Sequence, residues 1–323
     1  MNPNPGIRWG LVGYGDLADK RVAAALQEAP GSSLSSVWGR DPAKAAAFAR
    51  NHGIPKVHGD LDSLCGSDIE AVYVCTPPDS HADYALAAIA AGKHVLVEKP
   101  MAASTADCRR MIDAARRKGV VLGVAYYRRA HPKMLKIREL VRQGILGSPT
   151  WVNIACHAWF DPAPDDPKHW RVEKARSGGA GALADVGVHR LDLLEYWLGP
   201  AKVVFRDLHR LVHAHDVEDG ASIVLRLAGG APVHAYFSWN SRTWMDRFEI
   251  TGSEAKLIAD PLDSASLAVV RGRSREELSI EPPANAHLPC VGDFVAAVRE
   301  GRAPLCDGAG GLRVNQLLDD ILR

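Results

Sequence analysis

Residues 7–18 read IRWGLVGYGDLA, and this stretch decides the fold of the first part of the chain. The apolar run Ile7–Val12 predicts a buried strand, and the Gly-x-Gly-x-x-Ala sequence of residues 13–18 follows it at once. Such a turn uses its first glycine for a tight bend, its second for close approach of a ligand, and a small third residue for helix packing. Amide groups at the start of the helix then receive phosphates. We predict a dinucleotide-binding turn, with an ordinary strand-to-helix turn as the alternative; the predicted contacts are Gly13, Tyr14, Gly15, Asp16 and Leu17.

This stretch is the first of several similar units. Short apolar runs alternate with alanine-rich helical stretches through residue 125, which is typical of a parallel sheet with helices on its faces. Residues 1–125 are therefore expected to form a doubly wound Rossmann domain of the α/β class. The predicted strands are 7–12, 34–38, 71–75, 94–97 and 120–125, and the predicted helices are 21–28, 43–51, 81–90 and 105–118.

The pattern changes after residue 126. A helix is expected at 132–142, and from residue 149 onward extended segments between Gly, Pro or Asp turns outnumber helices, as in an antiparallel sheet. We predict that residues 126–323 form an α+β domain with an open, mainly antiparallel sheet, which binds the substrate. Helices at 182–198, 291–300 and 311–322 are expected to cover one face. The other face is the predicted surface for a homodimer or homotetramer. The predicted strands are 150–160, 202–211, 221–230, 233–240, 246–252 and 266–272.

The composition argues against several classes of protein. The chain has 323 residues, 47% of them hydrophobic, and its 39 basic and 38 acidic residues give a net charge of +1. Because no block of like charges occurs, we expect a small-molecule ligand rather than nucleic acid or a membrane surface. The six cysteines lack the spacing of a zinc site or a disulfide framework. The N-terminal MNPNPGIRWG lacks the pattern of a signal peptide, and no window reaches the about 20 apolar residues of a membrane span. We expect a cytoplasmic protein.

The end of the second predicted strand bears on the choice between NAD and NADP. An NAD site usually has an acid here for the ribose hydroxyls, whereas an NADP site needs a cation for the 2′-phosphate. The sequence has Gly39 where the acid is expected, and Arg40 follows. A guanidinium group binds phosphate through a planar fork of donors, so we predict a preference for NADP. Asp41 is the competing ribose ligand, and in that case the cofactor is NAD.

Two further strand ends reach the same edge of the predicted sheet. In an open parallel sheet, ligands bind beyond the carboxyl ends of the strands. The TPPDSH turn of residues 76–81 therefore brings Thr76, Pro77 and His81 to the cofactor. The stretch HVLVEKPMA of residues 94–102 runs from a buried strand directly into Glu98, Lys99 and Pro100. We predict that Glu98 and Lys99 lie beside the nicotinamide half of the cofactor.

Taken together, these motifs resemble the glucose-fructose oxidoreductase, inositol dehydrogenase and rhizopine-catabolism (Gfo/Idh/MocA) family. The resemblance rests on GYGDLA at 13–18, TPPDSH at 76–81, GKHVLVEKPMA at 92–102 and GALADVGVHRLDLLEYWLG at 181–199, and it covers essentially the whole chain. It implies a Rossmann domain followed by a domain with an open antiparallel sheet. It also implies NAD(P)-dependent redox chemistry on sugars, polyols or related hydroxy compounds.

The resemblance carries a catalytic set onto this chain. Lys99 of Glu-Lys-Pro matches the lysine near the reacting carbon, and Asp185 and His189 match the acid and histidine of Asp-x-Gly-x-His-x-x-Asp, which Asp192 completes. These residue types suit hydride transfer, because a proton must leave or join the substrate oxygen as the hydride moves. An imidazole titrates in the right range, and a lysine can donate a hydrogen bond to the oxygen. Asp185 is expected on the helical face of His189, four residues away.

Secondary candidates follow from the resemblance and from position. Trp170 and Arg171 match a Trp-Arg pair that family members carry near the cofactor or substrate. Tyr127 and Arg128 follow the fifth predicted strand, where the substrate crevice begins. Asp192 is a further candidate substrate ligand.

Other functions remain open at this stage. One is redox-neutral glycoside cleavage with tightly held NAD, and another is a non-catalytic nucleotide-binding sensor. A transition metal is a third idea, because His209, His213, His215 and Asp216 lie close together in the sequence. However, these side chains are expected on a strand end and a turn without a shared face, and the predicted chemistry needs no metal. We predict no metal site.

Overall fold

The computed structural model describes residues 6–323, so part of the N-terminal stretch MNPNPGIRWG lies outside it. The chain forms two compact units. One unit contains the described residues up to Ala130 together with Ala284–Asn315, and the other contains His131–Pro283 and Gln316–Arg323. The predicted domains, 1–125 and 126–323, are each continuous in sequence. In the structure, by contrast, Ala284–Asn315 belongs to the first unit, although it lies near the C-terminus.

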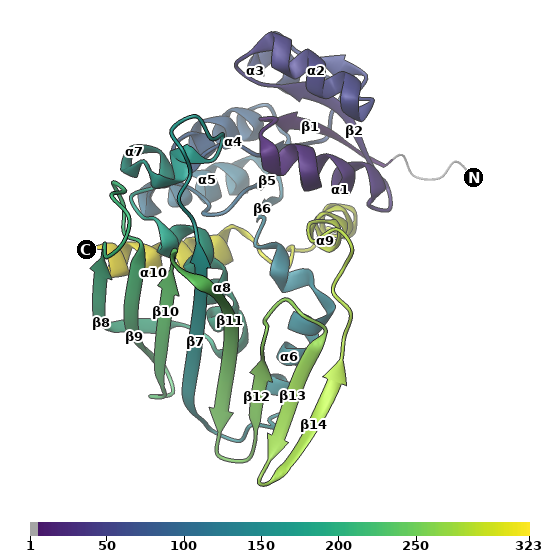
Figure 1. The fold of residues 1–323 in the computed structure, drawn as a ribbon. Helices are drawn as coiled ribbons and strands as arrows, with labels where there is room; N and C mark the ends of the chain where they lie inside the picture. The colour runs from purple at the N-terminus through teal and green to yellow at the C-terminus, as the bar shows by residue number, and fades with distance from the viewer. Residues whose placement is uncertain (1–5) are drawn as a thin grey trace. The chain divides into compact units, whose positions relative to one another are not determined.

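The first unit contains a six-stranded parallel sheet in the order β3-β2-β1-β4-β5-β6 (Figure 1). This is the predicted doubly wound Rossmann sheet. Its order reverses between β1 and β4, so a crevice is expected beyond the carboxyl ends of these two strands. The strands are β1 Ile7–Val12, β2 Ser32–Trp38, β3 Lys56–Val57, β4 Ala71–Val74, β5 His94–Val97 and β6 Leu122–Val124.

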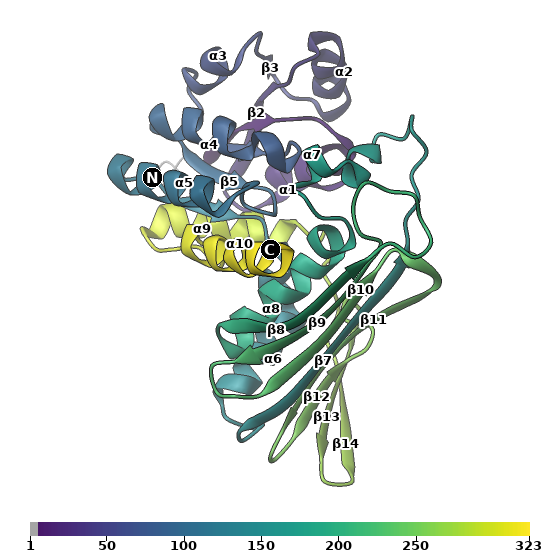
Figure 2. The ribbon, with the colours of Figure 1, turned by 90° about the vertical axis from the view of Figure 1, so that its left-hand side faces the viewer.

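Helices pack on this sheet because small and branched apolar residues recur on their inner faces. Ala18, Val22 and Leu26 are completely buried in the core beside β1. The helices α4 and α5 pack against each other, and Figure 2 shows them together. The helices of this unit are η1 Ala18–Val22, α1 Ala23–Glu28, α2 Pro42–His52, α3 Leu61–Cys65, η2 Pro78–Ser80, α4 His81–Ala90, α5 Thr105–Lys118, η3 Tyr127–Ala130 and α9 Leu288–Glu300.

The placement of α9 corrects the sequence analysis. The helix predicted at 291–300 was expected to cover the second sheet, but its residues Val291, Phe294 and Val295 belong to the core of the first unit. The ring of Phe294 lies 5.3 Å from that of Trp9 in β1. The prediction was wrong because an amphipathic helix shows which face is buried and not which sheet buries it.

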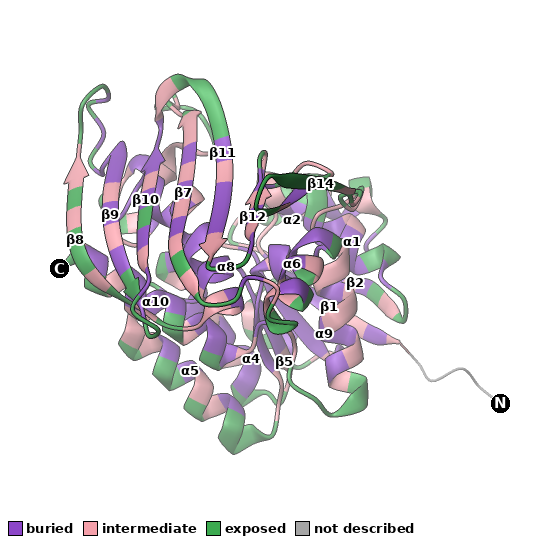
Figure 3. Cartoon of the chain, turned by 90° about the horizontal axis from the view of Figure 1, so that it is seen from below, coloured by how far each residue is buried: buried purple, intermediate pink, exposed green. Residues whose placement is uncertain are grey.

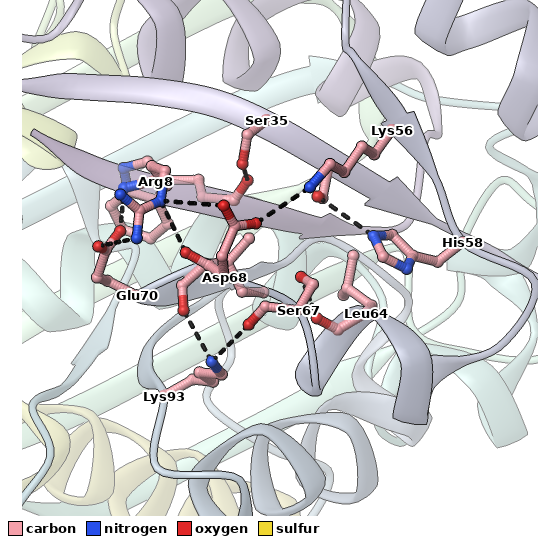
Figure 4. Close-up of polar contacts among 12 residues, drawn as sticks. Arg8, Ser35, Lys56, His58, Leu64, Ser67, Asp68, Glu70 and Lys93 are labelled. Atoms are coloured by element: carbon pink, nitrogen blue, oxygen red, sulfur yellow. Dashed lines mark hydrogen bonds and ion pairs between the residues drawn. The ribbon is translucent and has the colours of Figure 1, made fainter.

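Charged side chains cluster near the amino ends of the Rossmann strands (Figure 4). Arg8 at the start of β1 pairs with Glu70 at 2.5 Å and donates a hydrogen bond to the Asp68 carbonyl at 2.7 Å. Lys56 lies 3.3 Å from the Asp68 carboxylate. Lys93 donates to the carbonyls of Ser67 and Ile69 at 2.9 and 2.8 Å. The charged side chains at this edge of the sheet therefore have their partners within the protein.

The second unit contains an eight-stranded sheet in the order β14-β13-β12-β11-β7-β10-β9-β8. Neighbouring strands are antiparallel except for β7 and β10, which are parallel, so the sheet is mixed and mainly antiparallel, as predicted. The prediction omitted β12 and β14. The strands are β7 Pro149–Trp159, β8 Ala201–His209, β9 Gly220–Leu227, β10 Pro232–Ser238, β11 Asn240–Gly252, β12 Lys256–Ala259, β13 Ser266–Arg271 and β14 Ser274–Ser279.

Helices cover one face of this sheet. Alternate residues of β10, namely Val233, Ala235 and Phe237, share a core with residues of α6, α8 and the end of α10. Figure 3 shows this alternation of buried and less buried residues along the strands. The helices with residues in this unit are α6 Pro132–Arg142, η4 His169–Val172, α7 Lys174–Ser177, η5 Leu183–Gly187, α8 Val188–Leu198 and, from Gln316 onward, α10 Gly308–Leu322.

Some apolar side chains of this sheet remain exposed, including Val204 and Phe205 in β8 and Trp244 in β11. The association of copies through the sheet stays a prediction. Within the described part of the chain, no helix is both long enough and apolar enough to cross a membrane.

Candidate functional site

The glycine-rich turn has the backbone geometry that the sequence predicts. Gly13 has a φ of 95°, and its amide donates to the Trp38 carbonyl at 3.0 Å. A Cβ atom on Gly13 would lie 2.5 Å from the Cys75 carbonyl oxygen, whereas one on Gly15 would meet nothing within 4 Å. The first glycine is therefore required by the contact between the ends of β1 and β4, and the second leaves its side of the turn open for a ligand. The turn fits a dinucleotide.

The side chains of the turn have separate surroundings. Asp16 pairs with Lys20, one helical turn later, at 2.5 Å. Leu17 packs on the edge of the core, and Ala18 is completely buried. The backbone of the turn thus offers the open surface, while Leu17 and Ala18 hold the helix on the sheet.

Tyr14 and Gly39 form a second contact between strand ends. The Tyr14 hydroxyl donates to the Asp41 carbonyl at 2.9 Å and accepts from the Asp41 amide at 2.8 Å. A Cβ atom on Gly39 would lie 2.1 Å from the Tyr14 ring, so only glycine leaves room for it. The absence of an acid at position 39 thus has a packing reason.

The side chain of Asp41 has hydrogen-bond partners within the protein, whereas that of Arg40 points to no described partner. The Asp41 carboxylate begins α2 as its N-cap, accepting from the amides of Ala43 at 3.0 Å and Lys44 at 3.1 Å. Arg40 is exposed, and no hydrogen bond or ion pair joins its side chain to the residues described. Arg40 is therefore available to bind a ligand, whereas the Asp41 carboxylate already caps α2.

His81 is a structural residue of the turn after β4. It is completely buried, and its Nε2 and Nδ1 atoms lie 2.7 Å from the Thr76 carbonyl oxygen and 2.9 Å from that of Pro100. Burial lowers the pKa of His81 despite these two carbonyls. Ser80 donates to the Thr76 hydroxyl at 2.9 Å, while Thr76 and Pro77 are half-buried. The ring of His81 thus joins the segments that follow β4 and β5, and its contact with the cofactor stays a prediction.

Glu98 follows β5 and is held in a buried polar network. Its Oε1 atom accepts from the Tyr73 hydroxyl at 2.6 Å and lies 3.3 Å from Nε2 of His287. Burial by itself raises the pKa of Glu98, but the contacts with His287 and Tyr73 and the charge of Lys99 outweigh it and lower the pKa. The Lys99 amide donates to the Glu98 carboxylate at 3.2 Å. This carboxylate thus fixes the start of the Lys99 segment.

Asn315 in α10 fixes the other end of that segment. It is buried, its Oδ1 atom accepts from the Met101 amide at 3.1 Å, and its Nδ2 atom donates to the Ala102 carbonyl at 2.8 Å. The Lys99–Pro100 peptide bond is cis, and Lys99 itself is half-buried. Neither His287 nor Asn315 was found from the sequence, because each lies about 200 residues from its partners and carries no local motif.

Tyr127 and Arg128, the predicted substrate residues, adjoin the Glu98 network. The rings of Tyr127 and His287 lie 4.5 Å apart, and the guanidinium carbon of Arg128 lies 4.9 Å from the Tyr127 ring centre. Arg128 is buried, and Tyr127 is half-buried. The first unit therefore groups these residues with the Lys99 segment through His287.

The second unit carries the Asp-x-Gly-x-His motif on η5 and α8. Asp185 lies in η5, a π-helical turn whose hydrogen bonds join residues five apart. The spacing from Asp185 to His189 therefore does not have the regular α-helical geometry that the sequence analysis assumed. Asp185 accepts from Arg171 at 3.1 Å, so the structure brings together two predicted residues 14 positions apart. The Trp170 ring lies 5.7 Å from the same guanidinium group.

Glu218 holds the start of this helical segment and was not among the residues predicted from the sequence. Its carboxylate accepts from the Gly181 amide at 2.8 Å and the Leu183 amide at 2.9 Å. Burial raises its pKa. The signal available in the sequence was the pair Glu218-Asp219 before a strand, which is indistinguishable from a solvated turn.

Buried groups surround the rest of the motif. His189 is 6% and Asp192 1% exposed. Arg190 between them pairs with Asp246 in β11 at 2.7 Å and donates to the Val186 carbonyl at 2.8 Å. The ion pair fixes the helix that carries His189 on the sheet.

Comparisons with known proteins agree with this geometry. Residues 7–126 match the model of an oxidoreductase family with an NAD-binding Rossmann fold, and residues 134–258 match the Gfo/Idh/MocA C-terminal domain. A 1,5-anhydro-D-fructose reductase of Ensifer adhaerens is 32% identical over 94% of this chain and 92% of its own length. A dTDP-3,4-didehydro-2,6-dideoxy-alpha-D-glucose 3-reductase of Saccharopolyspora spinosa is 30% identical over 91% of this chain and 88% of its own.

Solved structures are similar over nearly the whole chain. A levoglucosan dehydrogenase in complex with NADH and levoglucosan has a TM-score of 0.89 at 25% identity, covering 98% of this chain and 96% of its own. A 3-ketoreductase from Actinomadura kijaniata in complex with TDP-benzene and NADP has a TM-score of 0.82, also at 25% identity and with the same coverage of both chains. With both units matched and a relative at 32% identity, this chain belongs to the Gfo/Idh/MocA family of NAD(P)-dependent oxidoreductases.

Proposed function

We propose that this protein transfers a hydride between NADP(H) and a sugar, polyol or related hydroxy or keto compound. The reductase of Ensifer adhaerens and the levoglucosan dehydrogenase are both named for sugar substrates, as is the dTDP-sugar reductase. Their likeness to this chain supports a carbohydrate or polyol substrate. The single structural observation behind the proposal is the open turn at Gly13 and Gly15, at the point where the strand order reverses.

The preference for NADP rests on the end of β2. To bind the ribose hydroxyls of NAD, the Asp41 carboxylate would have to give up its hydrogen bonds to the amides that begin α2. Arg40 needs no such rearrangement to bind a 2′-phosphate. The proposal therefore assigns phosphate recognition to Arg40 and helix capping to Asp41, with NAD(H) as the alternative cofactor.

When bound, the nicotinamide accepts or gives the hydride. The residues of this chain must then manage the proton on the substrate oxygen. In our proposal, the Lys99 ammonium donates a hydrogen bond to that oxygen and His189 takes the proton during oxidation, or returns it during reduction. Arg171 fixes the orientation of the Asp185 carboxylate, and we assign to this carboxylate the binding of a substrate hydroxyl.

The rigid setting of Lys99 supports this assignment. Buried partners fix the backbone on both sides of it, through Glu98 before it and Asn315 after it. A fixed donor lowers the barrier more than a mobile one, because little reorganisation accompanies the reaction.

The first test is cofactor binding. Cofactor-free protein is titrated separately with NADPH and NADH while the cofactor fluorescence is followed. We expect NADPH to bind about tenfold more tightly, or about 1.4 kcal/mol. The better cofactor is then used in a panel of sugars and polyols, and absorbance reports its oxidation or reduction. Failure of both cofactors to bind, or binding without turnover of any carbohydrate or polyol, would contradict the proposal.

A further inference from the structure

Two loops of the second unit bring three metal-binding side chains together. Asp161 follows β7, while His213 and His215 lie in the connection from β8 to β9 (Figure 1). Nε2 of His215 lies 3.1 Å and Nδ1 of His213 lies 3.7 Å from the same oxygen, Oδ1 of Asp161. All three atoms lie within 4.8 Å of one another.

This cluster differs from the one considered in the sequence analysis. His209 lies on β8 with its Nδ1 atom 3.1 Å from Asp207. Asp216 accepts from the Lys174 amide at 3.2 Å. The carboxylate that meets His213 and His215 is Asp161, which is more than 50 positions away in the sequence. The four residues considered from the sequence therefore do not form one cluster, and the acid that meets the two imidazoles could not be found among their sequence neighbours.

The imidazole of His213 is oriented for ligation. Nε2 of His213 lies 3.1 Å from the Trp239 carbonyl oxygen, which can only accept, so Nε2 carries the hydrogen. In the neutral ring, Nδ1 then has its lone pair directed toward Asp161. A hydrogen bond from the second ring nitrogen to a carbonyl is the usual support of a metal-bound histidine. The His213 and His215 rings are nearly parallel, with centres 4.7 Å apart and an angle of 15° between their planes.

The protein holds this arrangement by itself. The Asp219 carboxylate accepts from the amides of Leu211, Val212 and His213 at 2.8 to 3.1 Å. Burial opposes its charge, but these amides lower the pKa of Asp219 to about 2. Arg210 donates to the His215 carbonyl at 2.9 Å. The histidine loop is therefore shaped before any ligand arrives.

The two histidines of the cluster are shielded from solvent, whereas the carboxylate is accessible. The side chains of His213 and His215 are 3% and 8% exposed, whereas that of Asp161 is 52% exposed. Trp159 packs edge-on against His213, with ring centres 4.6 Å apart. Two buried nitrogen ligands and one carboxylate that opens to solvent form a three-ligand site with an accessible further position.

We propose that Asp161, His213 and His215 bind a divalent transition metal ion with the coordination preferences of zinc. Two imidazoles and one carboxylate suit zinc, cobalt(II) or nickel, while calcium and magnesium prefer sites made of oxygen. The ion connects the loop after β7 to the loop after β8. Phe160, next to Asp161, lies 5.9 Å from the Arg171 guanidinium, which pairs with Asp185. The proposed role of the ion is therefore to stabilise the loop that leads to the candidate catalytic motif.

The test is binding of cobalt(II) and zinc to tag-free, chelator-treated protein. Cobalt(II) in a site with nitrogen ligands gives visible absorption bands, and equilibrium dialysis gives the stoichiometry. We expect one ion per chain, displacement of cobalt(II) by zinc, and a melting temperature that rises with zinc concentration.

Matched variants identify the ligands. Asp161→Asn changes an exposed side chain and should leave the fold intact, and both it and His215→Ala should weaken binding at least about tenfold. His209→Ala is the control, because His209 lies nearby in the sequence but contacts Asp207 instead. This variant should bind the metal ion as tightly as the wild-type chain does. No saturable binding to the wild-type chain would overturn the proposal and leave a hydrogen-bonded cluster. Equal loss in the His209 variant would overturn the assignment.

Discussion

The two edges of the Rossmann sheet treat charged and polar groups in opposite ways. At the amino ends of β1, β3 and β5, the side chains of Arg8, Lys56 and Lys93 bind carboxylates or carbonyls of neighbouring residues (Figure 4). At the carboxyl ends, Gly15 borders open space and Arg40 is exposed without a bond to the residues described. The amino edge of the sheet therefore carries a network of paired charges, whereas the carboxyl edge is open at Gly15 and Arg40.

This difference separates stability from function. A charge whose partners lie within the protein contributes to folding and adds little to ligand binding. The buried groups at the carboxyl edge, namely Glu98, His81 and Asn315, instead hold the backbone of the loops that follow the strands. Substitutions at the two edges should therefore move different measured quantities.

The largest contrast is expected between substitutions of Lys93, which precedes β5, and of Lys99, which lies two residues after it. Lys99→Met should reduce kcat by about 10²–10⁴-fold, because the substrate oxygen loses its donor, while NADPH affinity changes little. Lys93→Met removes a cation that two carbonyls bind at the amino edge, so it should lower the free energy of unfolding by about 1–2 kcal/mol and leave kcat unchanged. Steady-state kinetics and urea unfolding measure both variants.

The comparison would fail in two ways. A Lys99 variant with the wild-type kcat would remove Lys99 from the reaction. A Lys93 variant with a large loss of kcat at full folding would show that the amino edge takes part in function.

Glu98→Gln tests the buried support of the Lys99 segment. The variant should lose about 2 kcal/mol of unfolding free energy at pH 7, because a buried carboxylate and its partners lose their charge-assisted contacts. The pKa of Glu98 is lower in the folded state than in the unfolded chain. Its contribution is therefore complete above the unfolded value and disappears as the pH falls through the folded one.

Urea unfolding from pH 7 to acid checks the sign. The wild-type chain should lose more stability than Glu98→Gln as the pH falls below the ordinary carboxyl range. Asp68→Asn is the matched change at the amino edge, where the carboxylate is exposed, and its effect should be much smaller. A wild-type chain and Glu98 variant with parallel pH profiles would contradict the assignment.

Arg40→Ala should change cofactor choice. We expect a loss of about tenfold in NADPH affinity, or about 1.4 kcal/mol, and little change in NADH affinity. Arg50→Ala is the control, because Arg50 is an exposed arginine near the opposite end of α2. Equal losses for NADPH and NADH in Arg40→Ala would show that this residue does not read the 2′-phosphate.

Much of the fold could be predicted from the sequence, because periodicity and glycine position act locally. The strands at 7–12 and 94–97 and the helices at 81–90, 105–118 and 132–142 have the predicted bounds. The parallel pair of β7 and β10 and the packing of α9 on the first unit could not be predicted. Both depend on which distant segments meet, and a hydrophobic face does not specify its partner.

The candidate site divides in the same way. Lys99, Asp185 and His189 stand in short motifs, so they could be named from sequence. His287, Asn315 and Glu218 could not, because a single buried polar residue has no signature until its partners are known. Gly39 shows the intermediate case: its position at the strand end was noticed, but its reason, the ring of Tyr14, depends on the fold.

The smallest expected effect comes from Arg8→Gln, and it sharpens the contrast with Arg40. Arg8 binds Glu70 and the Asp68 carbonyl, but its side chain is 38% exposed, so solvent weakens these contacts. We expect a loss of less than about 1 kcal/mol in unfolding free energy, which shrinks further in 1 M salt because an exposed ion pair is screened. NADPH affinity should stay at the wild-type value. A drop in NADPH affinity like that of Arg40→Ala would mean that a closed charge network at one edge of the sheet still reaches the cofactor at the other, and the separation of the two edges would have to be abandoned.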